Sequence, residues 1–332
     1  MTTSVTLAHL QLEWDQNYLD YPDTNQWAHH DVASAADGRI VTGHPDGRSL
    51  LVFGPDGRHL DTVETQTIEL HGISNDGARE DSFWIADPGE KCTPGEPEYD
   101  DFVRPGRVLN VSLTDREVVG EIHQPALEIY EDKAWHPTAV AHVRSGHDAD
   151  ATESVWVADG YGESLLHQFS ADGKYLSTLD GTSSGLAFNT PHALFANSLG
   201  DATELLVADR TNRRIVVLSS AGEFLRTFGS DDLTSPSGLA VMDDGTILVT
   251  ELFGAVTAFS AEEVLIGCLG SATAEDELRA GWPNDINAEG NASKPALHPG
   301  QFNSPHGICI TAGAVLVTEW VIGGRVIRLA PV

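Results

Sequence analysis

The chain of 332 residues carries 50 aspartate and glutamate residues against 19 lysine and arginine residues, a formal net charge of −31 at pH 7. This charge excludes nucleic acids and anionic membranes as favoured partners, because affinity for phosphates depends on cationic contacts. Residues 1–12 lack the basic and apolar regions of a secretory signal, and no stretch approaches the roughly 18 apolar residues of a membrane span. We therefore expect a soluble protein.

The chain has only three cysteines, widely spaced and without a CxxC pair: Cys92, Cys268 and Cys309. This set predicts neither a disulfide framework nor a thiolate metal cluster, and a reducing, cytoplasmic compartment fits it best. The oligomeric state is open at this level. So is the question of whether the acidic surface is an adaptation to concentrated salt.

One unit of about 40 residues recurs along the chain, a period typical of propeller blades. Each copy starts with a short aliphatic strand, continues with a strand that ends in Asp or Glu, and closes with a third strand before a turn. The clearest copy spans residues 190–228. In chain order the six copies start at AHHDVAS, ELHGIS, HPTAVAH, TPHALFA, SPSGLAV and SPHGICI.

The last copy stops after its third strand, whereas residues 5–14 alternate apolar and polar side chains with no blade of their own. We expect this N-terminal segment to complete the last blade as its outer strand, because ring closure removes exposed sheet edges. The prediction is an all-β fold, a six-bladed propeller of the NHL-repeat type, with one domain over residues 1–332.

Two insertions interrupt the period, residues 88–105 and residues 271–299. The first is acidic and rich in Pro and Gly, and the second is polar with a short helix expected at AEDELRAG. We expect both as loops over one face, because long loops on a rigid scaffold often serve as functional lids.

One column of the repeat, at the start of the innermost strand, is rich in histidine: His30, His71, Thr138, His192, Ser237 and His306. Successive blades of such a ring are about 60° apart, so His71, His192 and His306 on alternate blades are expected to converge in the central channel. Three imidazoles with open positions predict a catalytic metal site, for zinc first and for iron, cobalt or manganese otherwise. The alternative is three hydrogen-bonded core histidines.

His30 occupies the same column in the first blade, and three roles are open for it: fourth ligand, acid/base group or packed residue. The strands that follow end in acidic residues, which are expected to hydrogen-bond turns. Tyr161 and Arg210 lie just beyond two of these strand ends. At the channel mouth they would act as proton acceptor and anion clamp.

The segments LHGIS, HPTAV, VADGYGES, FNTPHAL, VADRTNRRI and FNSPHGI together resemble the catalytic core of peptidyl-α-hydroxyglycine α-amidating lyase, an NHL-type propeller. The resemblance implies zinc on His71, His192 and His306, Tyr161 as catalytic base and Arg210 on the substrate carboxylate. It also implies a structural calcium bound partly through backbone carbonyls near the channel. In that family, cleavage of a carbinolamide C–N bond yields glyoxylate and an amide.

Four positions depart from that family. Residues 44–46 stand where it has a second substrate arginine, although Arg48 could reach the same space. Ser304 replaces a methionine, Gly307 replaces an acidic residue, and His30 replaces a small polar residue. The family's secretory cysteines also have no counterparts. We therefore expect the scaffold and the metal site to transfer, and the peptide substrate not to.

The sequence thus predicts a metal-dependent lyase that cleaves a small hydroxy-acid adduct of the carbinolamide type. One alternative is a metal-dependent hydrolase on the same site, with metal-bound water as nucleophile and His30 or Tyr161 as base. The other is a non-catalytic NHL binding scaffold.

Overall fold

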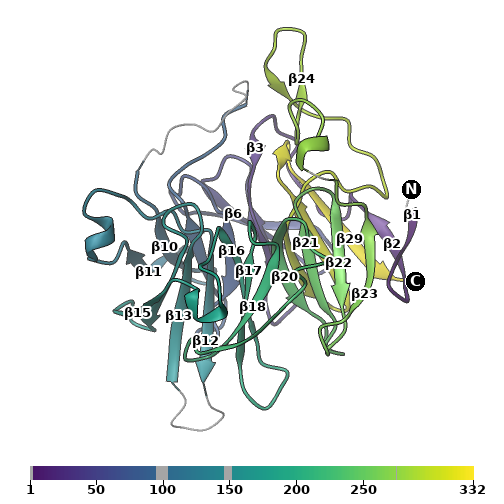
Figure 1. Ribbon diagram of the computed structural model, residues 1–332. Coiled ribbons are helices and arrows are strands. Elements are labelled where there is room, and N and C mark those ends of the chain that lie inside the picture. Colours follow the sequence, from purple (N-terminus) through teal and green to yellow (C-terminus); the bar gives the residue numbers. More distant parts are fainter. Residues whose placement is uncertain (1–2, 95–103, 146–151, 274) are drawn as a thin grey trace.

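The computed structural model describes residues 3–94, 104–145, 152–273 and 275–332, so residues 95–103 of the first insertion lie outside the described part. Six antiparallel sheets stand around a central axis (Figure 1). Their innermost strands contact one another in a closed circuit, from the first blade through the sixth and back to the first. The expected six-bladed propeller is confirmed.

The first five blades are four-stranded sheets whose strands follow one another in chain order. Their strands are β4 (Val32–Ser34), β5 (Ile40–Gly43), β6 (Ser49–Phe53) and β7 (His59–Glu64); β8 (Gly72–Asn75), β9 (Ser82–Asp87), β10 (Arg107–Ser112) and β11 (Glu117–His123); β12 (Ala139–Ser145), β13 (Thr152–Asp159), β14 (Leu165–Ser170) and β15 (Tyr175–Leu179); β16 (Pro191–Asn197), β17 (Glu204–Asp209), β18 (Arg214–Ser219) and β19 (Phe224–Phe228); and β20 (Pro236–Val241), β21 (Ile247–Glu251), β22 (Ala255–Phe259) and β23 (Leu265–Gly270).

The sixth blade joins the two ends of the chain. It contains β26 (Pro305–Thr311), β27 (Ala314–Glu319), β29 (Arg325–Pro331), β2 (Leu10–Asp15) and β1 (Thr3–Leu7). Trp14 of β2 lies opposite Leu329 of β29, so the expected closure is confirmed. The segment forms two strands rather than one, because the chain reverses at Ala8, whose φ of 53° lies in the left-handed region.

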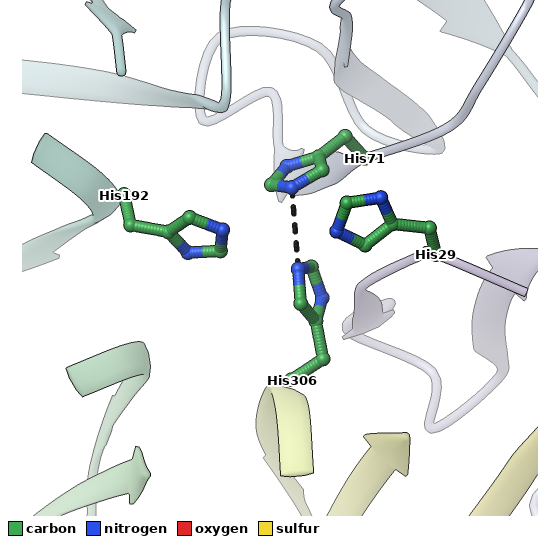
Figure 2. A group of neighbouring side chains, drawn as sticks. All are labelled: His29, His71, His192 and His306. Carbon is green, nitrogen blue, oxygen red and sulfur yellow. Dashed lines mark hydrogen bonds between the residues drawn. The ribbon is translucent and has the colours of Figure 1, made fainter. Parts of the chain in front are cut away.

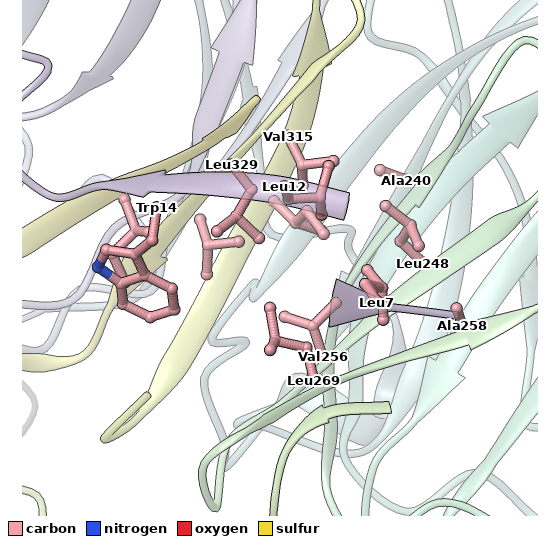
Figure 3. Close-up of a cluster of buried hydrophobic side chains, with 13 residues drawn as sticks. Leu7, Leu12, Trp14, Ala240, Leu248, Val256, Ala258, Leu269, Val315 and Leu329 are labelled. Atoms are coloured by element: carbon pink, nitrogen blue, oxygen red, sulfur yellow. The ribbon is translucent and has the colours of Figure 1, made fainter. Parts of the chain in front are cut away.

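The closing hairpin is held by apolar burial. Leu7, Leu12 and Trp14 are each at most 2% exposed and pack with side chains of the fifth and sixth blades (Figure 3). Alternate residues of β2 are exposed, which explains the apolar and polar alternation in the sequence.

Replacing Leu12 by alanine is expected to lower the free energy of unfolding by about 2 to 5 kcal/mol, because the side chain leaves a cavity between two blades. Urea denaturation measures the loss. Glu13→Ala, an exposed neighbour in the same strand, serves as control. Equal stability of the two variants would show that the hairpin does not hold the ring closed.

The second insertion carries η3 (Glu275–Glu277), a single 3-10 turn where a short helix was expected, and a small hairpin of β24 (Asp285–Ile286) and β25 (Ala292–Ser293). This hairpin rises from the top of Figure 1. A further pair, β3 (Trp27–Ala28) with β28 (Val321–Ile322), was not expected. The other turns are η1 (Glu128–Tyr130) and η2 (Thr182–Ser184). Among the described residues, no helix has the length and hydropathy to cross a membrane.

Candidate metal centre

Four buried histidines meet at the axis of the propeller: His29, His71, His192 and His306. One ring nitrogen of each lies within 4.8 Å of the corresponding atoms of the others, and each residue is at most 3% exposed. Figure 2 shows the four rings pointing toward a common centre. The structure therefore brings together the three histidines expected from alternate blades and adds a fourth.

Backbone carbonyls of the intervening blades orient three of these rings. The Nδ1 atoms of His71, His192 and His306 lie 2.6, 2.7 and 3.2 Å from the carbonyl oxygens of Thr138, Ser237 and His30. A carbonyl can only accept, so each Nδ1 carries the proton and each Nε2 presents its lone pair. Around the six positions of the histidine column, residues whose rings point to the centre thus alternate with residues whose backbone carbonyls hold those rings.

His30 does not join the cluster with its ring. Its Nε2 lies 2.5 Å from the Tyr21 hydroxyl, and its Nδ1 lies 2.9 Å from the Thr42 hydroxyl. Of the three roles left open for it, the structure supports the packed residue, and His30 contributes a carbonyl instead. The neighbouring His29, between β3 and β4, takes the fourth place. The column takes one residue from each blade, and in the first blade it took His30 rather than the adjacent His29.

All four rings are neutral at physiological pH. Burial, the largest cause, lowers the pKa of His71 to about 3 and holds the pKa values of His29, His192 and His306 well below the ordinary histidine value. Neutral imidazoles are the form that binds a metal ion. The residues present therefore fit a divalent transition metal.

Tyr161 places its hydroxyl beside the cluster. The oxygen lies 3.0 Å from Nε2 of His71, 3.1 Å from Nε2 of His192 and 3.3 Å from Nε2 of His29. Burial raises the pKa of Tyr161 above the ordinary value for tyrosine, and the adjacent Arg210 guanidinium opposes that shift.

The loop that carries Tyr161 follows β13 and is held by Asp159, which accepts hydrogen bonds from the backbone N–H groups of His136 (2.6 Å) and Glu163 (2.8 Å). The carboxylates at the other strand ends likewise accept from the loop before the same blade's inner strand: Asp87, Asp209, Glu251 and Glu319. The expected turn-bonding role of this column is what the structure shows. All five are at most 1% exposed, so they shape the loops and do not face solvent.

Arg210 follows β17, and its Nε and Nη2 atoms are buried without a hydrogen-bond partner in the described part of the chain. Burying a guanidinium N–H unpaired costs free energy unless an anion completes the site. Arg48, the other expected substrate residue, is exposed and does not line the pocket beside the cluster. Arg213 does line it.

A pocket of about 1140 Å³ opens beside the cluster. Its polar lining includes His29, Glu90, Tyr161 and Arg210, and its apolar lining includes Leu252, Phe253, Trp282 and Trp320. Glu90 is only 7% exposed, and burial raises its pKa to about 7. Sequence reasoning missed Glu90, because nothing in an acidic insertion marks which carboxylate turns inward.

Lys91 anchors the first insertion next to the cluster. Its Nζ lies 2.7 Å from the buried Glu69 carboxylate and 3.0 Å from the carbonyl of Trp27. Glu69 and Trp27 each stand two residues before a cluster histidine, so Lys91 ties together the segments that carry His71 and His29.

Lys91→Met is expected to destabilise the fold by about 3 to 5 kcal/mol at pH 8, because burial raises the pKa of Glu69 to about 7 and above that pH the variant leaves its charge buried and unpaired. Thermal and urea unfolding measure the change. Lys133→Met removes the exposed partner of Glu163 and is expected to cost about 1 kcal/mol or less. Adding Glu69→Gln to Lys91→Met should recover part of the loss, and no recovery would contradict this explanation.

The comparisons with known proteins give the class of fold. No family model matches the chain, and no curated protein matches it in sequence. Among solved structures, the chain is similar to a streptogramin B lyase at 13% identity over 97% of this chain and 98% of that one, with a TM-score of 0.56.

Two further structures agree. A protein of unknown function from Bacteroides thetaiotaomicron is 10% identical over 99% of this chain and 76% of that one, with a TM-score of 0.59. A catalytically inactive variant of virginiamycin B lyase from Staphylococcus aureus, with quinupristin, is 11% identical over 97% and 100%, with a TM-score of 0.57. At such identities the likeness shows the propeller fold, and these neighbours include lyases.

Proposed function

We propose that this protein is a metal-dependent lyase that cleaves the C–N bond of a small carbinolamide bearing a carboxylate, as the resemblance to the α-amidating lyase core implies. One observation carries the proposal. The Tyr161 hydroxyl lies within hydrogen-bond distance of three cluster histidines and beside the Arg210 guanidinium, whose buried Nε and Nη2 atoms have no hydrogen-bond partner in the described part of the chain.

Each group then has a role in one bond cleavage. Arg210 pairs with the substrate carboxylate and orients it. Tyr161, as phenolate, removes the proton of the substrate hydroxyl, the C–N electron pair passes to the nitrogen, and the Glu90 carboxylic acid donates a proton there. The products are an aldehyde acid and an amide. A metal held by His71, His192 and His306 would supply Lewis-acid stabilisation of the developing alkoxide.

The fourth histidine bears on the choice of metal. Four imidazoles complete the tetrahedral shell that zinc takes in structural sites, whereas catalysis needs an open position. Zinc therefore suits the proposal if His29 is not a ligand. Iron, cobalt or manganese suits it if all four rings are ligands, since these ions accept five or six ligands. The visible absorption of the cobalt-loaded protein separates the two arrangements.

The residues near the channel fit the calcium implied by the resemblance less well than the histidines fit a transition metal. Among the residues that line the channel beside the histidines, Asp31 is the one carboxylate, and its Oδ1 accepts the Val32 N–H at 2.7 Å. Calcium takes about six to eight oxygen ligands. One carboxylate that is already bonded matches this demand poorly, and no step here depends on calcium.

The direct test supplies α-hydroxyhippurate to the metal-loaded protein and measures release of benzamide and glyoxylate above the spontaneous rate. Release that requires Tyr161 supports the lyase. A hydrolase on the same residues, with Glu90 or Tyr161 as base for water, would instead carry label from ¹⁸O-water into its product at cleavage. A non-catalytic NHL scaffold would turn over neither type of substrate.

Glu90→Gln is expected to lower kcat/KM at pH 6 by about 100-fold, because the amide cannot donate the proton that the leaving nitrogen needs. Because the pKa of the Tyr161 base lies above that of the Glu90 acid, the wild-type rate should rise with pH up to about 7 and level off above it, where Glu90 loses its proton as Tyr161 does. The variant should lose this break and keep rising with pH. A break near pH 7 that persists in Glu90→Gln would assign it to another group.

The compartment belongs to the same proposal. Cys268 and Cys309 form no disulfide bond in the described part of the chain. This supports the reducing, cytoplasmic setting that the sequence suggested.

A further inference from the structure

Three aromatic side chains form one side of the pocket, and we call Phe253, Trp282 and Trp320 the aromatic wall. Their rings follow one another edge to face, with centroids 5.4 Å apart from Phe253 to Trp282 and 5.6 Å from Trp282 to Trp320. Trp320 lies 5.4 Å from the ring of His29. The wall therefore begins at the metal cluster and leads away from it along the pocket.

The middle ring of the wall comes from an insertion that is firmly attached to the propeller. Trp282 donates from Nε1 to the Asn303 carbonyl at 3.1 Å. The Pro283 carbonyl accepts from Arg279 and from Asn303, each at 2.9 Å, and the Ile322 N–H donates to the buried Asn284 side chain at 2.8 Å. These contacts hold Trp282 at the pocket before any ligand arrives, which lowers the cost of binding.

None of the three wall residues is fully buried, although all three line the pocket. Large rings that face a pocket rather than the core gain free energy when a ligand covers them. The same pocket is lined by Tyr161 and by Arg210, whose buried Nε and Nη2 atoms have no hydrogen-bond partner in the described part of the chain. A ligand that satisfies both the guanidinium and the aromatic wall must be anionic in one part and aromatic or bulky apolar in another.

We infer that the aromatic wall binds an aromatic acyl group on the amide side of the scissile bond, so that the substrates are N-aroyl or N-arylacyl α-hydroxyglycines rather than peptides. This inference rests on the proposed function for the position of the carboxylate and the hydroxyl. The wall then decides which amide is released.

The test uses ligands that lack the reacting hydroxyl and are not cleaved. N-benzoylglycine is expected to bind the zinc-loaded wild type about tenfold more tightly than N-acetylglycine in calorimetry, because only the benzoyl ring covers the wall. Trp282→Ala should reduce this preference to about twofold or less, and Trp282→Phe should keep most of it. Phe224→Ala, a partly exposed aromatic outside the pocket, should leave it unchanged. Arg210→Gln should weaken both ligands equally.

Benzamide tests the wall without the carboxylate. If benzamide binds and Trp282→Ala abolishes its binding, while neither acylglycine binds better than benzamide, the aromatic subsite stands and the hydroxy-acid function fails. If both acylglycines bind through Arg210 with equal affinity, the proposed function survives and this inference is overturned. Failure of benzamide and of both acids would overturn both.

Discussion

Replacing His192 by alanine is expected to lower the affinity for zinc or cobalt by about 100-fold or more. Zinc sites are worth roughly 10 to 16 kcal/mol at neutral pH, shared among their ligands, and the loss of one ligand removes a large part of this. His192 is 2% exposed and its Nδ1 lies 2.7 Å from the Ser237 carbonyl, so its ring is held in place at the cluster. Competition with a chromogenic chelator measures the affinity.

A matched control keeps this result specific. His167 is also buried, but it lies in β14, the third strand outward from the axis in the third blade. There its Nε2 is 2.7 Å from the Tyr130 hydroxyl. His167→Gln should therefore keep metal at the wild-type level. Metal retention in His192→Ala with full affinity, or equal loss in both variants, would show that the buried cluster is not the binding site.

His29→Ala adds a distinction that the other three histidines cannot give. Its ring stands among them in Figure 2, yet it comes from the segment between β3 and β4, next to the column residue His30. If the variant keeps metal with little loss of affinity, three ligands suffice. If it loses metal as His192→Ala does, the site is a four-histidine site, and an ion with five or six ligands becomes the better match.

The histidine column could be predicted from the sequence because the inner strands repeat with one register, so equivalent positions face the same axis. The alternation of His71, His192 and His306 with Thr138 and Ser237 can be read directly from the sequence. The role of Thr138 and Ser237 cannot, because they orient the rings through backbone carbonyls, which every residue has. Each carbonyl is in place because neighbouring inner strands lie in contact around the ring.

The rest of the site lies outside any repeat. His29 is placed by the pairing of two short strands, β3 with β28. Their paired residues Ala28 and Val321 are 293 positions apart in the sequence. Glu90 is placed by its neighbour Lys91 reaching Glu69, and Trp282 by contacts with Asn303. Such positions depend on single tertiary contacts between distant segments. No local pattern of residues predicts them.

Tyr161→Phe is expected to lower kcat by about 100-fold or more while leaving the metal content unchanged. General-base catalysis by one side chain contributes roughly 10² to 10⁴ in rate. The variant keeps the ring and its packing and removes only the oxygen that lies 3.0 to 3.3 Å from three histidine nitrogens. Turnover of α-hydroxyhippurate and elemental analysis of the same preparation measure the two quantities.

Tyr175→Phe is the control, because its hydroxyl bonds the Thr178 hydroxyl at 2.9 Å in the outermost strand of the third blade, away from the channel. It should turn over substrate at the wild-type rate. Arg210 makes the Tyr161 result more specific, since its charge lowers the pKa of the phenol against the effect of burial. Arg210→Gln should therefore move the break that Tyr161 sets in the pH profile to higher pH besides raising KM, whereas a residue that only bound the carboxylate would change KM alone. Wild-type turnover in Tyr161→Phe would exclude Tyr161 as the base of the mechanism.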